Sequence, residues 1–452
     1  MKNRKLLSIG IMFLFSILFF NVLHLYYKDN LKIDLRFEVK SNSQDDYQLF
    51  YRSNSNQQWT EEHSIIEAYE HPTKWNSMKY TLPLDSYEVR IDLGKKSGQK
   101  IEIKDLSLNG AKNVKVNLEE IVQQTNQVQM NIKHMEFKTK GDDPYVTLKL
   151  GSYFDLAKNG INYTKMAMIA LLSIIAAALF TFSLFNLRQV KSLFIEMYGR
   201  KNLVFSLAKN DFKTKYSSSY LGITWGFIQP LLIILTYWFV FQVGLKSASV
   251  MDVPFILWFM VGIVPWFYFS EAWSNATNVF VEYSYLVKKV VFNIEVLPIV
   301  RIVSALIVNL FFVLLLFTVS AAYGYYPNLY YLQIIYYSMC MILLTISISY
   351  ITSAVVLFFR DLYQIIGIVI QIGFWFTPIV WSYTMLSDFW LFVFKLNPMF
   401  YIVNGFRDSF INQIYFWQHP YQTIYFWFSC ILLLTIGLKV FRKLRPHFSD
   451  VL

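Results

Sequence analysis

Apolar residues in this chain gather into runs of roughly 20, and polar segments separate these runs. A helix of that length crosses the hydrocarbon core of a bilayer. The predicted fold class is therefore a polytopic α-helical membrane protein with about eight spans. These spans are expected at residues 6–27, 165–187, 223–245, 255–275, 295–323, 330–359, 362–380 and 421–441.

Residues 28–162, between the first two runs, follow a different pattern. Segments such as YEVRIDLG and KIEIKDLSLNG alternate apolar and polar residues, which places one face of a strand on a core and the other in water. The segments are short and are separated by turn-forming residues such as Gly94 and Gly110. This spacing predicts an inserted all-β, sandwich-like domain.

Three aromatic residues of this region, Trp59, Trp75 and Tyr80, are open to two interpretations. A flat ring can stack on a sugar, and YEVRIDLGKKSGQKIEIKDLSLNG resembles the carbohydrate-binding sandwiches fused to some bacterial cell-surface polysaccharide enzymes. The alternative, which we favour, is ordinary packing inside the sandwich.

Basic residues predict the orientation of the chain. The net charge is +11, and Lys and Arg of multi-pass proteins concentrate on the cytoplasmic side, so nucleic acid is not an expected partner. Both termini are therefore expected in the cytoplasm of a cell (plasma or inner) membrane, with residues 28–162 outside. The first run is long and lacks a small-residue cleavage site, which favours an uncleaved anchor over a signal peptide. The expected divisions are an anchor (1–27), the β-domain (28–162), a span (163–187), a cytoplasmic interface segment (188–222) and a six-span domain (223–452).

An amphipathic helix is expected within the basic segment LVFSLAKNDFKTKYSSSYLG. Val204, Ala208, Phe212 and Tyr216 recur every four residues and so share one helical face. Charged residues, among them Asp211, occupy the other faces. A helix of this kind lies in the membrane interface rather than crossing the bilayer. The alternative is a solvated linker helix.

The sequence contains no recognisable catalytic or nucleotide-binding motif. Neither G-x-x-x-x-G-K-[ST] nor G-x-G-x-x-G occurs. Cys340 and Cys430 both lie in apolar runs, where cysteines usually pack. No metal site, catalytic residue or cofactor is therefore expected in this chain.

Four segments resemble the membrane subunits of ABC exporters for O-antigen, capsular polysaccharide and teichoic acid. They are LAKNDFKTKYSSSYLGITWGFIQPLL, VPFILWFMVGIVPWFYFSEAWSNATNVFVEYSYLVKKVVFNIEVLPIV, VVLFFRDLYQIIGIVIQIGFWFTPIVW and LNPMFYIVNGFRDSF. They occur in the family's order and cover roughly residues 190–450. Asn293 departs from the family, which often has proline at this position.

The resemblance implies a transport subunit without its own ATPase motif, which exports a lipid-linked polysaccharide or a teichoic-acid-type polymer. Two copies would form the pore, and a separate ATPase subunit would bind ATP and Mg. The stretch 278–298 would form a cytoplasmic coupling helix whose residues in the ATPase groove are Tyr285, Leu286, Val287, Lys288 and Lys289. At the same surface would lie Asp211, Phe212, Lys213 and Tyr216. Two short outer helices, broken at Asn397-Pro398, would gate the exit.

A hydrated glycan favours a pore lined by aromatic rings, although aromatic belts also occur in membrane proteins generally. The candidates for such a lining are Trp225, Tyr237, Trp238, Trp258, Trp266, Tyr268 and Trp273. Glu271 and Arg301 lie in or near apolar runs, where charged groups tend to pair or to face water. We predict that these two face each other or the pore, the alternative being the cytoplasmic interface.

Two other functions remain open. One is a polytopic glycosyltransferase or glycan polymerase with the sandwich as its sugar-binding module. Against it, no catalytic cluster is found next to a span. The other is an ABC permease for a small lipid or drug, which the resemblance to the polysaccharide branch disfavours.

Overall fold

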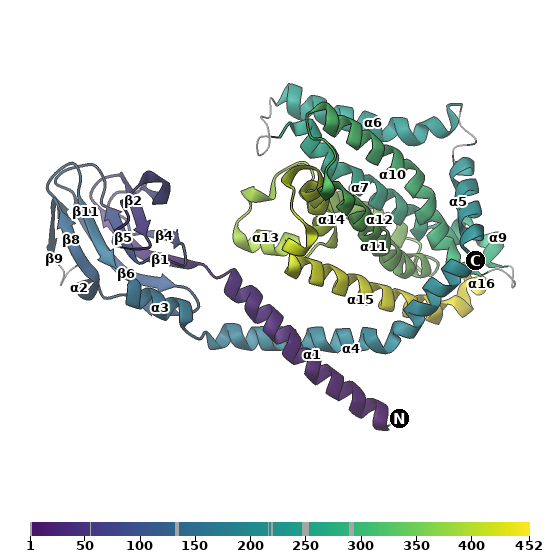
Figure 1. Cartoon of the computed structure of the whole chain (residues 1–452), viewed down its shortest axis with the longest axis horizontal. Coiled ribbons are helices and arrows are strands. Elements are labelled where there is room, and N and C mark those ends of the chain that lie inside the picture. Colours follow the sequence, from purple (N-terminus) through teal and green to yellow (C-terminus); the bar gives the residue numbers. More distant parts are fainter. Residues whose placement is uncertain are drawn as a thin grey trace. The chain divides into compact units, whose positions relative to one another are not determined.

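The computed structural model describes residues 2–54, 56–131, 135–215, 217, 220–245, 253–288 and 293–452. The chain divides into two compact units, Met1–Ala177 and Ala178–Leu452 (Figure 1). The predicted combination of apolar helices with an inserted all-β domain is confirmed.

Unit 1 begins with the apolar helix α1 (Lys2–Asp29) and continues into two antiparallel sheets. One sheet has the order β4-β1-β6-β10-β9, with β7 paired to β6, and the other has the order β3-β2-β5-β11-β8. The strands are β1 (Ile33–Ser41), β2 (Asp45–Arg52), β3 (Ser64–Tyr69), β4 (Asn76–Leu82), β5 (Glu88–Asp92), β6 (Lys100–Asn109), β7 (Asn113–Lys115), β8 (Val122–Asn126), β9 (Val128–Asn131), β10 (Glu136–Thr139) and β11 (Tyr145–Lys149). Short helices α2 (Leu118–Ile121) and α3 (Gly151–Asn159) and the 3₁₀ turn η1 (Glu61–His63) complete the domain.

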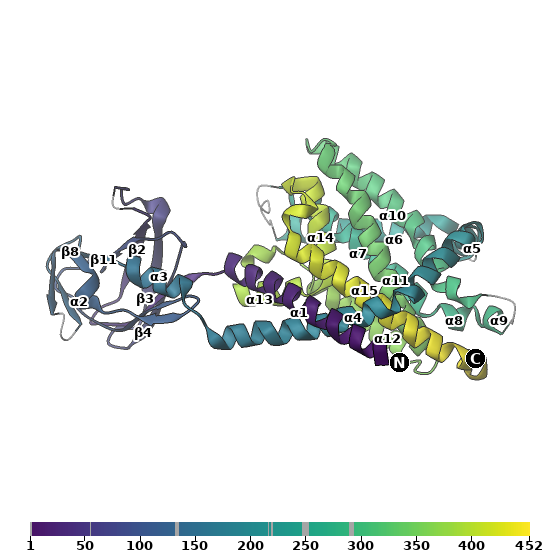
Figure 2. The ribbon, with the colours of Figure 1, turned by 60° about the horizontal axis from the view of Figure 1, so that its bottom comes forward.

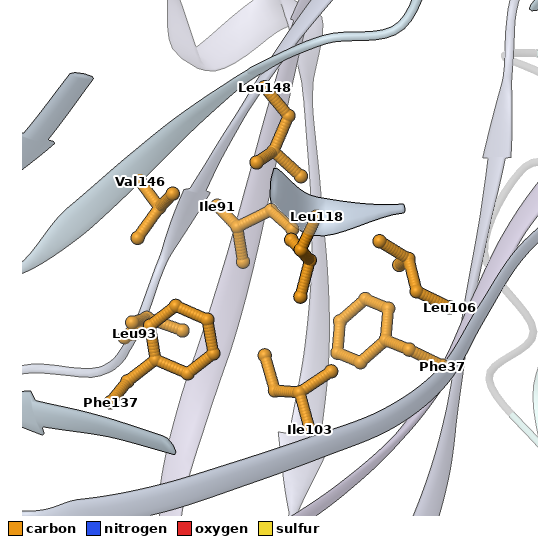
Figure 3. A pocket seen from close by; sticks show the side chains of 9 residues that line it. All are labelled: Phe37, Ile91, Leu93, Ile103, Leu106, Leu118, Phe137, Val146 and Leu148. Carbon is orange, nitrogen blue, oxygen red and sulfur yellow. The ribbon is translucent and has the colours of Figure 1, made fainter. Parts of the chain in front are cut away.

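The core of the β-domain is the predicted apolar face of its strands. In β1, Leu35, Phe37 and Val39 are buried and alternate with more exposed polar residues. Figure 3 shows the apolar side chains that meet between the strands, with Phe37 among them. Tyr80 is fully buried, stacks on Phe37, and donates a hydrogen bond to the carbonyl of Tyr47, so it is a core residue.

Trp59 and Trp75 lie nearer the surface of the same domain. The Arg52 guanidinium lies 4.3 Å from the Trp59 ring centroid. Trp75 is 39% exposed, and the ammonium groups of Lys104 and Lys40 lie 4.2 and 5.9 Å from its ring. Sugar stacking at Trp75 stays a prediction, whereas the core interpretation holds for Tyr80.

Unit 2 is a bundle of apolar helices, entered through the long helix α4 (Tyr163–Gly199). Its other helices are α5 (Lys201–Lys215), α6 (Trp225–Trp238), α7 (Phe255–Thr277), α8 (Val279–Glu282), α9 (Ser284–Val287), α10 (Leu297–Ala322), α11 (Gln333–Val355), α12 (Leu362–Trp375), α13 (Asp388–Lys395), α14 (Pro398–Arg407), α15 (Pro420–Leu444) and α16 (Phe448–Val451). Single turns are η3 (Gly222–Thr224), η4 (Phe239–Gly244), η5 (Ile294–Val296), η6 (Leu329–Leu332), η7 (Tyr383–Met385), η8 (Asp408–Asn412), η9 (Phe416–Gln418) and η10 (Arg445–His447). Helix α7 is the central helix, packed against α10, α11 and α14.

Within the described residues, seven helical segments are long and apolar enough to cross a membrane. The predicted span at 362–380 is shorter than expected, because α12 has 14 residues. At 1.5 Å per residue this is about 21 Å, which is less than the roughly 30 Å hydrocarbon core. The chain is a multi-pass membrane protein in which α12 is a short additional helix.

The predicted break at Asn397-Pro398 is confirmed. The Asn397 side chain accepts a hydrogen bond from the Met399 backbone N–H at 3.0 Å, and Pro398 is the first residue of α14. Both residues favour a helix start, Asn as the cap and Pro because it needs no N–H partner there. The chain therefore forms two short helices here, α13 and α14, rather than one continuous helix.

Candidate functional site

A buried carboxylate joins three elements at one end of unit 2. The Asp211 side chain, on α5, is only 4% exposed. It accepts hydrogen bonds from the Tyr283 hydroxyl at 2.7 Å and pairs with Arg301 Nη1, on α10, at 2.9 Å. A buried charge is stable only when it is paired and hydrogen-bonded, so Asp211 ties the segment around Tyr283 to two helices.

Arg301 contacts that segment in two further ways. Its Nη2 donates to the Glu282 carboxylate, and its guanidinium lies 4.9 Å from the Tyr283 ring centroid. Burial and the hydrogen bond to Asp211 raise the pKa of Tyr283 above its ordinary value, so the phenol remains a neutral donor at physiological pH. Glu282 also accepts from Asn278 at 3.0 Å. The segment is therefore held on both sides of Tyr283.

The predicted continuous helix over 278–298 is wrong. The chain instead forms two single turns, α8 and α9, and the backbone leaves the helical region between them at Tyr283 (φ −98°, ψ 31°). Tyr285 is 57% exposed and Lys288 is exposed, whereas Leu286 and Val287 are half-buried. We call residues 279–288 the coupling turn. Lys289 lies outside the described residues.

The coupling turn and α5 lie at the same end of unit 2, near the C-terminus (Figure 2). Tyr285 and Lys288 present an aromatic ring and a cation to solvent from a base fixed by buried ion pairs. Such a surface suits docking of a partner, because the exposed side chains are free while the backbone beneath them is held.

A second buried carboxylate, Glu295, follows the coupling turn. Its side chain is 6% exposed and pairs with Arg445 at 2.8 Å and Arg442 at 3.6 Å, at the end of α15. The Glu295 carbonyl accepts from the Tyr350 hydroxyl at 2.6 Å. This pairing connects the start of α10 to the C-terminal helix.

Asn293, the departure from the expected proline, has a structural role. Its side-chain oxygen accepts from the Glu295 backbone N–H at 3.1 Å and caps the turn η5. Its amide nitrogen donates to the Glu196 carboxylate on α4. Proline could not make these contacts. Sequence reasoning missed Glu282 and Glu295, and the only local signal was one carboxylate within the coupling turn and one after it.

The predicted apolar face of α5 is confirmed for Val204, Ala208 and Phe212, which are buried; α5 packs against α10. Asp211 was predicted on a face other than the apolar one, yet it is buried as those three residues are, against Arg301. Lys213 is exposed, and Tyr216 lies outside the described residues.

Glu271 and Arg301, both in the described part of the chain, do not pair with each other as predicted. Glu271 pairs instead with Lys215 at the end of α5, and Arg301 pairs with Asp211 and Glu282. Each charge has a partner on a neighbouring element, so both serve contacts between helices.

Most of the aromatic residues predicted to line a pore are packed inside unit 2. Residues 255–269 of α7 are apolar all round, and such a stretch belongs to an interior. The four candidates on α7 are at most 9% exposed: Trp258, Trp266, Tyr268 and Trp273. On α6, Trp225 is 40% exposed, and Tyr237 and Trp238 are partly buried. Of the predicted set, only the α6 residues face outward enough to line a pore.

Comparison with known proteins identifies the matching region. The sequence profile of the ABC-2 type transporter family matches residues 202–411. The O-antigen export system permease protein RfbA of Klebsiella pneumoniae is 27% identical over 253 residues, which cover 56% of this chain and 95% of that protein. The protein of the same name from Myxococcus xanthus is 26% identical over 257 residues, which cover 56% of this chain and 97% of that protein. The profile match contains the coupling turn and leaves out the β-domain.

Proposed function

Because residues 202–411 carry an ABC-2 type transporter domain, we propose that this chain is the membrane subunit of an exporter for a cell-envelope polysaccharide. The polymer is lipid-linked, of the O-antigen or teichoic-acid type. The support comes from relatives that are named as O-antigen export permeases and align along nearly their whole length. Two copies of the chain enclose the path by which the polymer crosses the membrane. A separate subunit binds and hydrolyses ATP with Mg²⁺.

The coupling turn is the surface on which the ATPase subunit docks. The single observation that carries this assignment is the buried Asp211–Arg301 pair, extended by the half-exposed Glu282, beneath the exposed Tyr285 and Lys288. A displacement of the turn by the ATPase would reach α10 through Arg301 and α5 through Asp211. Rigid contacts of this kind transmit motion because packed elements shift as units.

The same assignment fixes the orientation. The coupling turn and the C-terminus face the cytoplasm, where basic residues of multi-pass proteins concentrate. Three predicted spans, in α4, α6 and α7, separate the β-domain from the coupling turn. The β-domain then lies outside the cytoplasm, where Trp75 and its lysine neighbours contact the emerging polymer or another envelope component. The short helices α13 and α14 lie at the outer end of the path.

Purification of the chain from its native membrane in mild detergent tests this proposal. ATP hydrolysis should co-purify with the wild-type chain and should be lost from a double variant, Tyr285→Ala with Lys288→Glu. Lys191→Glu is the matched control, because Lys191 is exposed on α4 and lies outside the coupling turn. If no ATPase activity co-purifies with the wild-type chain, or if the double variant retains this activity fully, the docking assignment is wrong.

A further inference from the structure

A small cavity lies between α7, the turn η7, the end of α14 and η8. Trp258, Ser382 and Arg407 are buried around its inner part, and Tyr383 and Ile411 are partly buried. Asn412 also lines the cavity and is exposed, so the cavity can be reached from outside unit 2. None of these residues belongs to the coupling turn or to the ion pairs beneath it.

Arg407 brings a buried positive charge to this cavity. It is 3% exposed, and its guanidinium carbon lies 3.6 Å from the Trp258 ring centroid. Nη2 donates to the Ile379 carbonyl at 3.1 Å. Nε and Nη1 have no hydrogen-bond partner among the described residues. Two unsatisfied charged donors in a buried position are costly, and native proteins usually provide such groups with an acceptor.

The neighbouring carboxylate does not supply that acceptor. Asp408 is buried, but its Oδ2 pairs with His419 at 3.2 Å and its Oδ1 accepts from Asn412 at 2.8 Å. No ion pair to Arg407 is found in the described part of the chain. The guanidinium is therefore oriented by an aromatic ring and one carbonyl, while its Nε and Nη1 are left without an acceptor in the described part of the chain.

The space around the guanidinium depends on a glycine. A Cβ on Gly262 would lie 2.9 Å from Arg407 Nη2, so any larger residue on this part of α7 would push the guanidinium away. Gly262, Trp258 and the Ile379 carbonyl together set the position of Arg407, which lines the cavity, and its Nε and Nη1 are buried without an acceptor among the described residues.

We propose that this cavity, the Arg407 cavity, binds one oxyanion, a phosphate or carboxylate group. The inference rests on the proposed function in one respect: the anion is carried either by the exported polymer or by a lipid headgroup at the outer end of the path. Arg suits the task because its planar guanidinium can stay stacked on Trp258 while its remaining N–H groups bind oxygen. A neutral sugar carries no negative charge for the guanidinium to attract and would bind weakly.

The test uses the full chain in phosphatidylcholine nanodiscs, with binding followed by calorimetry and by shifts in melting temperature. Glycerol phosphate and glucuronate are the soluble anions, and glucose is the neutral control. We expect at least one anion to bind and glucose not to bind. Arg407→Gln should weaken anion binding at least tenfold, and Arg407→Lys should weaken it less. Arg360→Gln is the matched control, since Arg360 is exposed and distant in sequence from the cavity.

A second arm identifies the source of the anion. If the group belongs to a lipid, replacing part of the phosphatidylcholine by phosphatidylglycerol should stabilise wild type and not Arg407→Gln, whereas soluble anions should have little effect. Should Arg407→Gln fail to fold, Gly262→Ala displaces the guanidinium and should reduce binding in the same way. Equal anion binding by wild type and the Arg407 variants, or no response to soluble anions or to phosphatidylglycerol, overturns the proposal. Loss of co-purifying ATPase from the wild type would instead count against the proposed function.

Discussion

Replacing Arg301 by methionine should be among the most damaging single changes at the coupling turn. Methionine keeps much of the side-chain volume but leaves the Asp211 carboxylate, which is 4% exposed, without its cation. Removing one partner of a buried ion pair costs about 3–5 kcal/mol. The second contact, to Glu282, adds little, because that carboxylate is 45% exposed and surface pairs contribute about 0–1 kcal/mol. The expected loss of unfolding free energy is therefore about 3–5 kcal/mol.

Two further variants separate the ion pair from its surroundings. Tyr283→Phe removes only the hydroxyl that donates to Asp211 and should cost about 1.5–3 kcal/mol, as for a hydrogen bond to a charged group. The double variant Asp211→Leu with Arg301→Met should lose much less than the two single changes added together, since no unpaired charge remains. Denaturant unfolding in mixed micelles measures the wild type, the three single variants and the double variant. A cost for Arg301→Met below about 1 kcal/mol, or strict additivity in the double variant, would refute the buried pair.

Two other predictions concern the bundle and the β-domain. Gly405→Ala would place a Cβ 2.0 Å from the Tyr337 ring, with an overpacking cost of about 1–3 kcal/mol, and should reduce the yield of folded protein in detergent. Gly367→Ala is the control: a Cβ there has no neighbouring atom within 4 Å, so the yield should not change. In the β-domain, burial alone would raise the pKa of Asp34, but hydrogen bonds led by that from Arg36 outweigh it and lower the pKa. The carboxylate should therefore stabilise the domain above pH about 4 and lose this effect as the pH falls through the lowered pKa. Calorimetric melting between pH about 2 and 7 should show this pH dependence in the wild type and its loss in Asp34→Asn.

Local patterns in the sequence predicted much of the fold. Period-two alternation identified the strands of the β-domain, and β1 buries the expected alternate residues. Four-residue spacing identified the buried face of α5, and Asn397-Pro398 predicted the break before α14. These features depend on neighbours along the chain, so the sequence displays them directly.

The ion pairs of the candidate site could not be predicted in the same way. Asp211 and Arg301 are far apart in sequence and meet only because α5 packs against α10. The helical wheel of α5 does not show the partner of Asp211, because Arg301 lies on another helix. The pairing of Glu295 with Arg445 likewise requires the end of α15 to reach the start of α10.

The burial of the α7 aromatic residues follows from the composition of that helix. A helix that is apolar on every side belongs to the interior of a bundle rather than to the wall of a wet path. The burial of Trp258 and Trp266 follows from that composition. Arg407 lies in the second of the two predicted short outer helices, and its burial against Trp258 depends on Gly262, a contact that no periodicity reveals.

The most direct test of the account is to deplete this chain in its native cell and locate the envelope polymer by lectin or antibody labelling of intact and of lysed cells. An exporter predicts that polymer continues to be made and accumulates inside the cytoplasmic membrane, out of reach until lysis. Restoring the wild-type chain should return the polymer to the surface, and the variant Tyr285→Ala with Lys288→Glu should not. Continued surface display after depletion, or a complete stop of polymer synthesis as expected for a glycan polymerase, would contradict the account.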